Sequence, residues 1–174
     1  MTLDYCQSHQ DRMERVSHLG FLCNAEEAAA HIAPYAPILE VGAGNGYLAS
    51  KINARVPGQI IATDPQHDTS WCFTHGEHFP ITRLTAARAV TTHTPNYTVL
   101  MCWPTLNHPW ANIAAHRMAP GQRLIYIGEG AYGCTADDAF HKNLSSNFLE
   151  IAGHAIDQYH GIHDYLTIYQ KKGE

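Results

Sequence analysis

Residues 38–48 read ILEVGAGNGYL, and the rest of the chain can be placed relative to this stretch. The apolar residues 37–41 predict a strand, and the alternating glycines Gly42, Gly44 and Gly46 lead from it into a helix predicted over 45–55. A glycine can adopt a positive φ and leaves room for a bound group, so this spacing favours a turn that a ligand approaches closely. We expect that ligand to carry a nucleoside.

The glycine spacing and Glu40 bear on which ligand binds this turn. Nicotinamide and flavin dinucleotides usually bind Gly-x-Gly-x-x-Gly, where the helix N-terminus faces a pyrophosphate. Here Gly46 comes one residue too early for that pattern, and Glu40 would repel a pyrophosphate but could hold the cationic amino group of a methionine moiety, directly or through water. Asp64 ends the next predicted strand, 59–64, where a carboxylate can accept both hydroxyls of a ribose. A tight turn that binds nothing is the remaining alternative.

This Glu-x-Gly-x-Gly-x-Gly pattern, followed by a strand that ends in an acid, resembles motif I of the class I (Rossmann-like) S-adenosylmethionine (SAM) methyltransferases. The resemblance implies SAM as the cofactor, bound also by the ends of the second, third and fourth strands. In many members of the family an acid after the third strand accepts the adenine amino group, but this chain has none there, so that contact must differ. The expected cofactor-binding residues are Glu40, Gly42, Ala43, Gly44, Gly46, Asp64, Pro65, Thr85, Ala86 and Cys102.

Composition limits the number of domains and the kinds of partner. The chain has 174 residues, 45% of them hydrophobic and 16% charged, which fits a single globular domain over 1–174. The formal net charge is −5, and the basic residues do not run together. Because affinity for nucleic acid depends on clustered Lys and Arg, we expect a small-molecule substrate, or less readily a protein, and no nucleic acid.

Cysteine usage and the N-terminus predict a cytoplasmic location. The five cysteines form no CxxC pair and leave one over, which suits a reducing compartment rather than a disulfide framework. The N-terminus lacks a basic segment followed by an apolar one, and no apolar run approaches the roughly 18 residues of a membrane span. We therefore expect no membrane partner. The oligomeric state stays open, with a homodimer as one arrangement.

The remaining pattern predicts an α/β protein of seven strands. Residues 1–24 suit a short amphipathic helix that either packs on the sheet edge or, as the resemblance implies, covers the cofactor as a lid. Asn24 should cap a helix to about Ala33, and Asp137 or Thr135 should cap a later one. Further strands are expected at 81–85, 97–102, 123–127, 149–159 and 164–170, with helices at 87–92, 109–119 and from the late cap to 148, and no helical period over 65–80. The resemblance implies a three-layer, mostly parallel, doubly wound sheet with an antiparallel C-terminal strand.

Trp103, Glu129 and His163 are the candidate catalytic residues, because ligands of such sheets bind at the carboxyl ends of the parallel strands. Cys102 and Trp103 stand where amino-methylating members of the family often carry Asn or Asp and then Pro-Pro; Trp103 is predicted to wall the pocket or else to pack in the core. Glu129 could bind substrate, act as a general base or cap a helix. His163 could be a base oriented by Asp164, although neighbours on a strand point to opposite faces.

The chemistry that the resemblance implies is in-line methyl transfer, in which positioning does most of the work and a base serves only an acceptor that keeps its proton. Two alternatives keep the SAM site: a binding module or partner subunit without catalysis, and an enzyme that uses SAM for another reaction. A nicotinamide-dependent oxidoreductase is a third. A metal site at Cys72, His75 and His78, with His67 and Asp68 nearby, is not expected, because the spacing does not match a zinc site.

Overall fold

The computed structural model describes residues 5–65 and 76–173. Within these ranges the chain forms one seven-stranded sheet in the order β3-β2-β1-β4-β5-β7-β6. Strands β1 to β5 pair in parallel, β7 runs antiparallel to β5, and β6 runs antiparallel to β7. The strands are β1 (Ile38–Val41), β2 (Ile60–Thr63), β3 (Ile81–Thr82), β4 (Thr98–Cys102), β5 (Arg123–Gly128), β6 (Phe148–His154) and β7 (Tyr165–Lys171). The predicted α/β class and its antiparallel C-terminal strand are confirmed.

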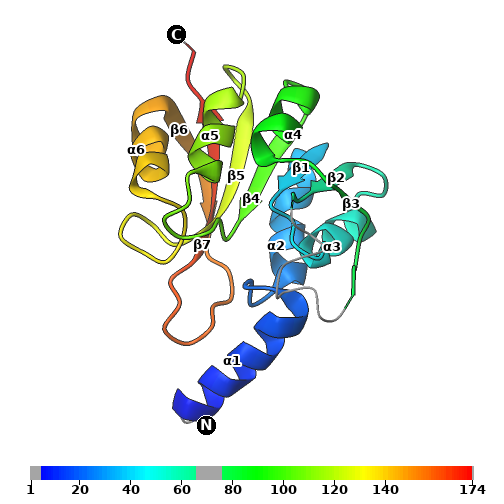
Figure 1. Ribbon diagram of the computed structural model, residues 1–174, viewed down its shortest axis with the longest axis vertical. Coiled ribbons are helices and arrows are strands. Elements are labelled where there is room, and N and C mark those ends of the chain that lie inside the picture. The colour runs from blue at the N-terminus through cyan, green and yellow to red at the C-terminus, as the bar shows by residue number, and fades with distance from the viewer. Residues whose placement is uncertain (1–4, 66–75, 174) are drawn as a thin grey trace.

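Helices cover both faces of the sheet and complete three layers (Figure 1). One core cluster joins the sheet to α2 and α3, and a second joins it to α4, α5 and α6. The helices are α1 (Tyr5–Leu19), α2 (Ala25–Ile32), η1 (Ala33–Tyr35), α3 (Tyr47–Arg55), α4 (Ala86–His93), α5 (Trp110–Arg117) and α6 (Asp138–Asn147).

Alternation along the strands sends neighbouring side chains into different layers. In β4, Val99 and Met101 belong to the cluster of α4, α5 and α6, whereas Leu100 between them belongs to the cluster of α2 and α3. This is the period of two of a strand that is buried on both faces. The same alternation places Glu40 on the α2 and α3 face, since Leu39 and Val41 belong to the opposite cluster.

Several element boundaries differ from the sequence prediction, each for a local reason. Strand β3 ends at Thr82 rather than at 85, because Thr85 is already the N-cap of α4 and accepts the Arg88 N–H at 3.3 Å. Of the two predicted caps for α6, Asp137 serves, since its side chain accepts the Phe140 N–H at 2.8 Å. Strand β6 ends at His154 instead of 159, because β7, its only partner in the described sheet, begins at Tyr165.

Helix α1 projects beyond the edge of the sheet where β7 begins, which is the carboxyl edge of the parallel strands (Figure 1). Its last turn is anchored by Val16, which is 2% exposed, while Met13 is largely exposed. Arg15 donates to the Cys23 carbonyl at 3.1 Å and lies 5.9 Å above the ring of Tyr159 in the loop between β6 and β7. This location suits a lid; that function stays a prediction.

Candidate functional site

The glycine turn joins β1 to α3 and is held by the backbone of β2. The N–H groups of Gly42 and Ala43 both donate to the Thr63 carbonyl, at 2.9 and 3.0 Å. A Cβ on Gly46 would lie 2.9 Å from the Phe79 carbonyl oxygen, so this glycine is required by packing as well as by its φ of +77°. At Gly44, by contrast, nothing in the described ranges lies within 4 Å of the Cβ position. Among the described residues the turn is therefore closed at Gly46 and open at Gly44.

Asp64 lies beside the open part of this turn. Its Oδ2 accepts the Gly44 N–H at 3.1 Å, and its own N–H donates to the Thr82 carbonyl at 3.2 Å. A carboxylate anchored through one oxygen by a backbone N–H has a fixed direction. Asp64 is half-buried, which suits a group that meets a ligand at the protein surface.

Glu40 lies under the turn and is 2% exposed. In the described ranges its Oε2 has no hydrogen-bond partner. Burial, and then the charge of Asp64, raises the pKa of Glu40 to about 8. A buried carboxylate without a partner is unfavourable, and an ammonium group brought to Oε2 would remove that penalty.

Trp103 follows β4 and is linked to Asp164, which precedes β7. Its indole N–H donates to Asp164 Oδ2 at 3.0 Å, and its ring stacks on Phe21 with centroids 5.6 Å apart. The backbone of Trp103 has a φ of +50°, a strained conformation for a bulky residue. Asp164 is 1% exposed, and its Oδ1 has no partner in the described part of the chain.

The Glu129 carboxylate accepts hydrogen bonds from two loops, one at Cys134 and one at His163. Its Oε2 accepts the Cys134 N–H at 2.7 Å and its Oε1 accepts the His163 N–H at 2.9 Å. Burial alone would raise the pKa of Glu129, but these two N–H donors outweigh it and hold the pKa below its ordinary value. A carboxylate of lowered pKa is a weak base, so these contacts favour a positioning role.

The two neighbours His163 and Asp164 point apart, as alternation along an extended chain requires. The side chain of His163 is exposed, whereas that of Asp164 is buried against Trp103. No hydrogen bond joins the His163 ring to the Asp164 carboxylate in the described structure. The structure therefore does not bring them together as a base and its orienting acid, and a separate role for His163 stays a prediction.

Solved structures share this architecture. TrmN from Thermus thermophilus aligns with a TM-score of 0.54 at 12% identity over 84% of this chain, which spans only 48% of that longer protein. An rRNA methylase from Streptococcus thermophilus aligns with a TM-score of 0.51 at 12% identity, over 87% of this chain and 99% of the other. The Burkholderia thailandensis 1,6-didemethyltoxoflavin-N1-methyltransferase, with bound 1,6-didemethyltoxoflavin and S-adenosylhomocysteine, aligns with a TM-score of 0.51 at 15% identity, over 99% and 93%.

The chain has the class I methyltransferase fold. No protein-family model matches the sequence, and no curated protein matches it either. At these identities the likeness of solved structures concerns the fold, and a fold can carry unrelated functions. What distinguishes this chain is therefore the chemistry of the residues at its site.

The other predicted cofactor residues follow neighbouring strands of the class I fold. Pro65 comes directly after Asp64 and is exposed, and its carbonyl accepts a hydrogen bond from Arg83 at 3.3 Å. Thr85 and Ala86 begin α4 after β3, where the Thr85 hydroxyl is already used as the helix cap. Cys102 ends β4, and burial, followed by the charges of Glu40 and Asp164, raises the pKa of its thiol well above the ordinary value. A thiol in these surroundings is a poor nucleophile.

The residues of the metal alternative lie mostly in the segment 66–75. His67, Asp68, Cys72 and His75 lie outside the described residues. His78 is described, and its N–H donates to the Asn45 carbonyl at 2.8 Å, so this residue packs on the glycine turn. Within 5–65 and 76–173, no three His, Cys, Asp or Glu side chains gather as a metal site, and every helix is too short or too polar to span a bilayer.

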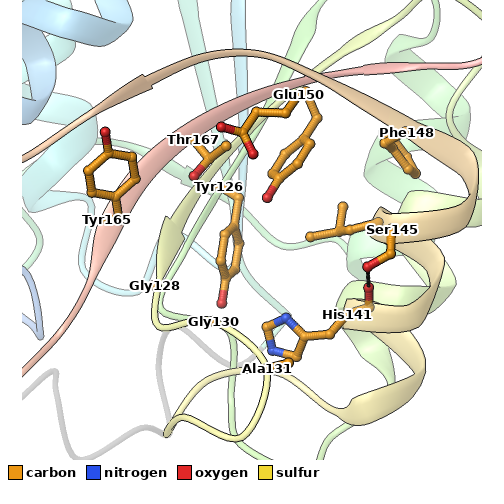
Figure 2. A pocket seen from close by; sticks show the side chains of 12 residues that line it. Tyr126, Gly128, Gly130, Ala131, His141, Ser145, Phe148, Glu150, Tyr165 and Thr167 are labelled. Atoms are coloured by element: carbon orange, nitrogen blue, oxygen red, sulfur yellow. Dashed lines mark hydrogen bonds between the residues drawn. The ribbon is translucent and has the colours of Figure 1, made fainter.

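A separate hollow of about 390 Å³ lies between α6 and strands β5, β7 and β6. Figure 2 shows the rings of Tyr126, Phe148 and Tyr165 around it, with Glu150 at the strands and His141 on the helix. Tyr126 belongs to the core cluster of α4, α5 and α6, so this hollow opens on the opposite face of the sheet from Glu40. It is distinct from the site at the glycine turn.

Two residues of the site differ from their predicted roles. The sequence pattern indicates Asp164 at the carboxyl edge as an orienting partner of His163, whereas the structure pairs it with Trp103; an acid just before an apolar strand is the signal that points to it. Tyr159 is predicted at the end of a strand, whereas it lies in the loop between β6 and β7, and its hydroxyl is buried without a partner in the described ranges.

Proposed function

We propose that this protein binds SAM at the glycine turn and transfers its methyl group to a small molecule. The observation that carries the proposal is Glu40, whose buried Oε2 has no hydrogen-bond partner in the described residues and which lies next to a turn that these residues leave open at Gly44. This arrangement favours a ligand with both a nucleoside and a cationic amino group. Dinucleotides lack such an amino group at this end and bring a pyrophosphate that Glu40 would repel.

The residues of the turn fit the parts of SAM. Asp64, anchored through Oδ2 by Gly44, would accept the ribose hydroxyls, and Glu40 would face the methionine ammonium. Pro65, Thr85, Ala86 and Cys102 would border the adenine and the reacting end, since they follow the adjacent strands β2, β3 and β4. Gly42, Ala43 and Gly46 would shape the backbone without contributing side-chain chemistry.

SAM supplies a methyl group that is already activated by its sulfonium. The chain then has to orient the acceptor and exclude water, which is the kind of catalysis that positioning provides. Trp103 suits the role of a wall, because its ring is held by Phe21 on one side and by Asp164 through the indole N–H. Glu129 would hold the loops at 130–134 and 160–163 in place around that wall, and the exposed His163 would lie at the rim.

The net charge of the chain favours a small molecule over RNA. Asp164, Glu129 and Asp157 lie at the carboxyl edge, and the chain as a whole has a formal net charge of −5. A phosphate backbone is bound by clustered Lys and Arg. In the described residues Arg12 and Arg15 of α1 lie beside these acids, so the preference rests on the net charge of −5. One solved structure of the same fold is an rRNA methylase and another is a small-molecule N-methyltransferase, so the fold itself serves both classes.

Calorimetric titration with SAM, S-adenosylhomocysteine and NAD tests the cofactor. Binding of the first two without NAD is the expected result, and tight binding of NAD alone would overturn the proposal. Incubation with SAM and a fractionated metabolite extract then tests catalysis through release of S-adenosylhomocysteine. If S-adenosylhomocysteine is released only when an RNA fraction is added, the acceptor is RNA and not a small molecule. If SAM binds but no fraction leads to S-adenosylhomocysteine release, the protein is a non-catalytic module.

A further inference from the structure

Three buried polar atoms have no hydrogen-bond partner in the described part of the chain: Glu40 Oε2, Asp164 Oδ1 and the Tyr159 hydroxyl. They come from β1, from the residue before β7 and from the loop between β6 and β7. All three segments reach the carboxyl edge of the sheet. Buried polar groups are nearly always paired, so a group of unpaired ones at one edge indicates that something else supplies the partners.

Cys102, at the end of β4, lies near two of these groups. The Cys102 thiol is close enough to both Glu40 and Asp164 for their charges to add to the effect of burial on its pKa. Around Tyr159, burial raises the pKa of the hydroxyl, the nearby Arg15 of α1 opposes that rise, and Cys23 adds to it. Arg15 and Cys23 therefore place α1 and the segment after it beside Tyr159, and the charge of Asp164 also reaches Cys23.

Glu40 and Asp164 would serve different groups. If Glu40 is paired by the methionine ammonium, as the proposed function has it, Oε2 is accounted for. Asp164 precedes β7, which lies on the far side of β4 from β1 in the sheet, and its carboxylate is bonded to Trp103, so we assign it a partner of its own. Its Oδ2 is held by the Trp103 indole N–H at 3.0 Å, which fixes the direction of Oδ1.

We propose that Asp164 Oδ1 is the binding group for an amine of the acceptor substrate, in a subsite walled by Trp103 and Cys102. An ammonium supplies the N–H donors that Oδ1 lacks in the described part of the chain and adds to the positive charge of the nearby Arg12, and such charge-assisted bonds are the strongest of their kind. A carboxylate or phosphate substrate would meet Asp164 with like charge. This inference rests on the proposed function for the assignment of Glu40, and it narrows the substrate class to small amines.

Benzylamine, benzyl alcohol and benzoate are suitable probes, because they share a ring for the aromatic wall and differ in charge. Calorimetry on the protein saturated with S-adenosylhomocysteine should show benzylamine binding about tenfold or more tightly than benzoate, with benzyl alcohol between them. D164N keeps an acceptor for the Trp103 N–H but removes the charge, and it should abolish the preference. D138N changes an exposed Asp at the start of α6 and should preserve it.

The affinity of D164N for S-adenosylhomocysteine separates this inference from the proposed function. That affinity should equal the wild-type value, since Asp164 is assigned to the acceptor. Equal binding of benzylamine and benzoate, no binding of benzylamine, or an unchanged preference in D164N would overturn the inference even if the cofactor binds. If D164N does not fold, W103F is the variant to use, because it removes the hydrogen bond to Oδ2 and should weaken benzylamine binding several-fold. An unchanged benzylamine affinity in W103F would also overturn the inference. If S-adenosylhomocysteine fails to bind the wild type, the proposed function fails, and the same probes on the free protein still test Asp164.

Discussion

The Gly44 N–H donates to Asp64 Oδ2 at 3.1 Å, which locks the acid at the end of β2 to the middle of the glycine turn. One side chain thus links two segments that lie 20 residues apart in the chain. The bond gives Asp64 two tasks, because it orders the turn and directs the carboxylate toward the proposed ribose.

Replacement of Asp64 separates these tasks. D64A should weaken SAM binding by about 1 to 3 kcal/mol, the loss expected for charge-assisted hydrogen bonds to a ligand. D64N keeps an oxygen acceptor for the Gly44 N–H and should retain more of the fold while still losing affinity. Titration calorimetry of both variants and of D138N measures the difference. Wild-type affinity in D64A would mean that the ribose binds elsewhere.

Gly44 and Gly46 should respond differently to the same substitution. G46A brings a Cβ to 2.9 Å from the Phe79 carbonyl oxygen and keeps a φ of +77°, so we expect a loss of about 2 to 4 kcal/mol in the free energy of unfolding. G44A meets no atom of the described residues within 4 Å, and only its φ of +57° is unfavourable, which costs roughly 1 kcal/mol.

SAM affinity should respond more strongly to G44A than to G46A, the reverse of the order expected for stability. The methyl group of G44A enters the space proposed for the ligand, so this variant should fold and yet bind SAM poorly. Urea denaturation and calorimetry on the two variants give both quantities. If G44A binds SAM as the wild type does, the open side of the turn is not the cofactor site.

The pH dependence of stability should report on Glu40. Burial, and then the charge of Asp64, raises the pKa of Glu40 from 4.5 to about 8, so the folded protein keeps a proton that the unfolded chain has released. The unfolded state binds fewer protons in this window, and the free energy of unfolding should therefore fall as pH rises from about 4.5 to about 8.

E40Q removes the ionisable group and should lose this slope. Compared with the wild type, the variant should gain stability toward about pH 8 and show no such gain near about pH 5, in urea denaturation without SAM. E150Q, which changes an exposed carboxylate, should keep the wild-type slope. Parallel pH profiles for E40Q and the wild type would contradict the raised pKa.

Sequence patterns predicted the fold well because its signals are local. The glycine turn, the caps at Asn24 and Asp137 and the apolar runs of β1, β4 and β5 each depend on residues close in the chain. The hydrogen bond between the Trp103 indole and the Asp164 carboxylate joins residues 61 positions apart. It also depends on a positive φ at Trp103, which no local sequence pattern predicts. The extent of β6 likewise depends on where its partner begins.

Replacement of Glu129 distinguishes two roles for this residue, a general base and a positioning residue that holds two loops together. Because its two oxygens accept the N–H groups of His163 and Cys134, the amide of E129Q would turn an NH₂ group toward one of these donors. We expect the free energy of unfolding to fall by about 1 to 3 kcal/mol at neutral pH. The pKa of Glu129 lies below 4.5, so its stabilising effect is present above that pH and is lost as pH falls through the lower value. The difference between E129Q and the wild type should therefore shrink in acid.

Kinetics complete the distinction for Glu129. A positioning residue acts on the acceptor site through the loops at 130–134 and 160–163. In that role E129Q should lower kcat/KM several-fold and leave the shape of the pH–rate profile unchanged. A general base would instead impose its own pKa on that profile, and its loss would reduce the rate by about two orders of magnitude or more. S-adenosylhomocysteine release, followed across pH with an acceptor found in the extract assay, measures both. A large loss of rate together with unchanged stability would assign Glu129 to proton transfer and leave the two loops to be held by other contacts.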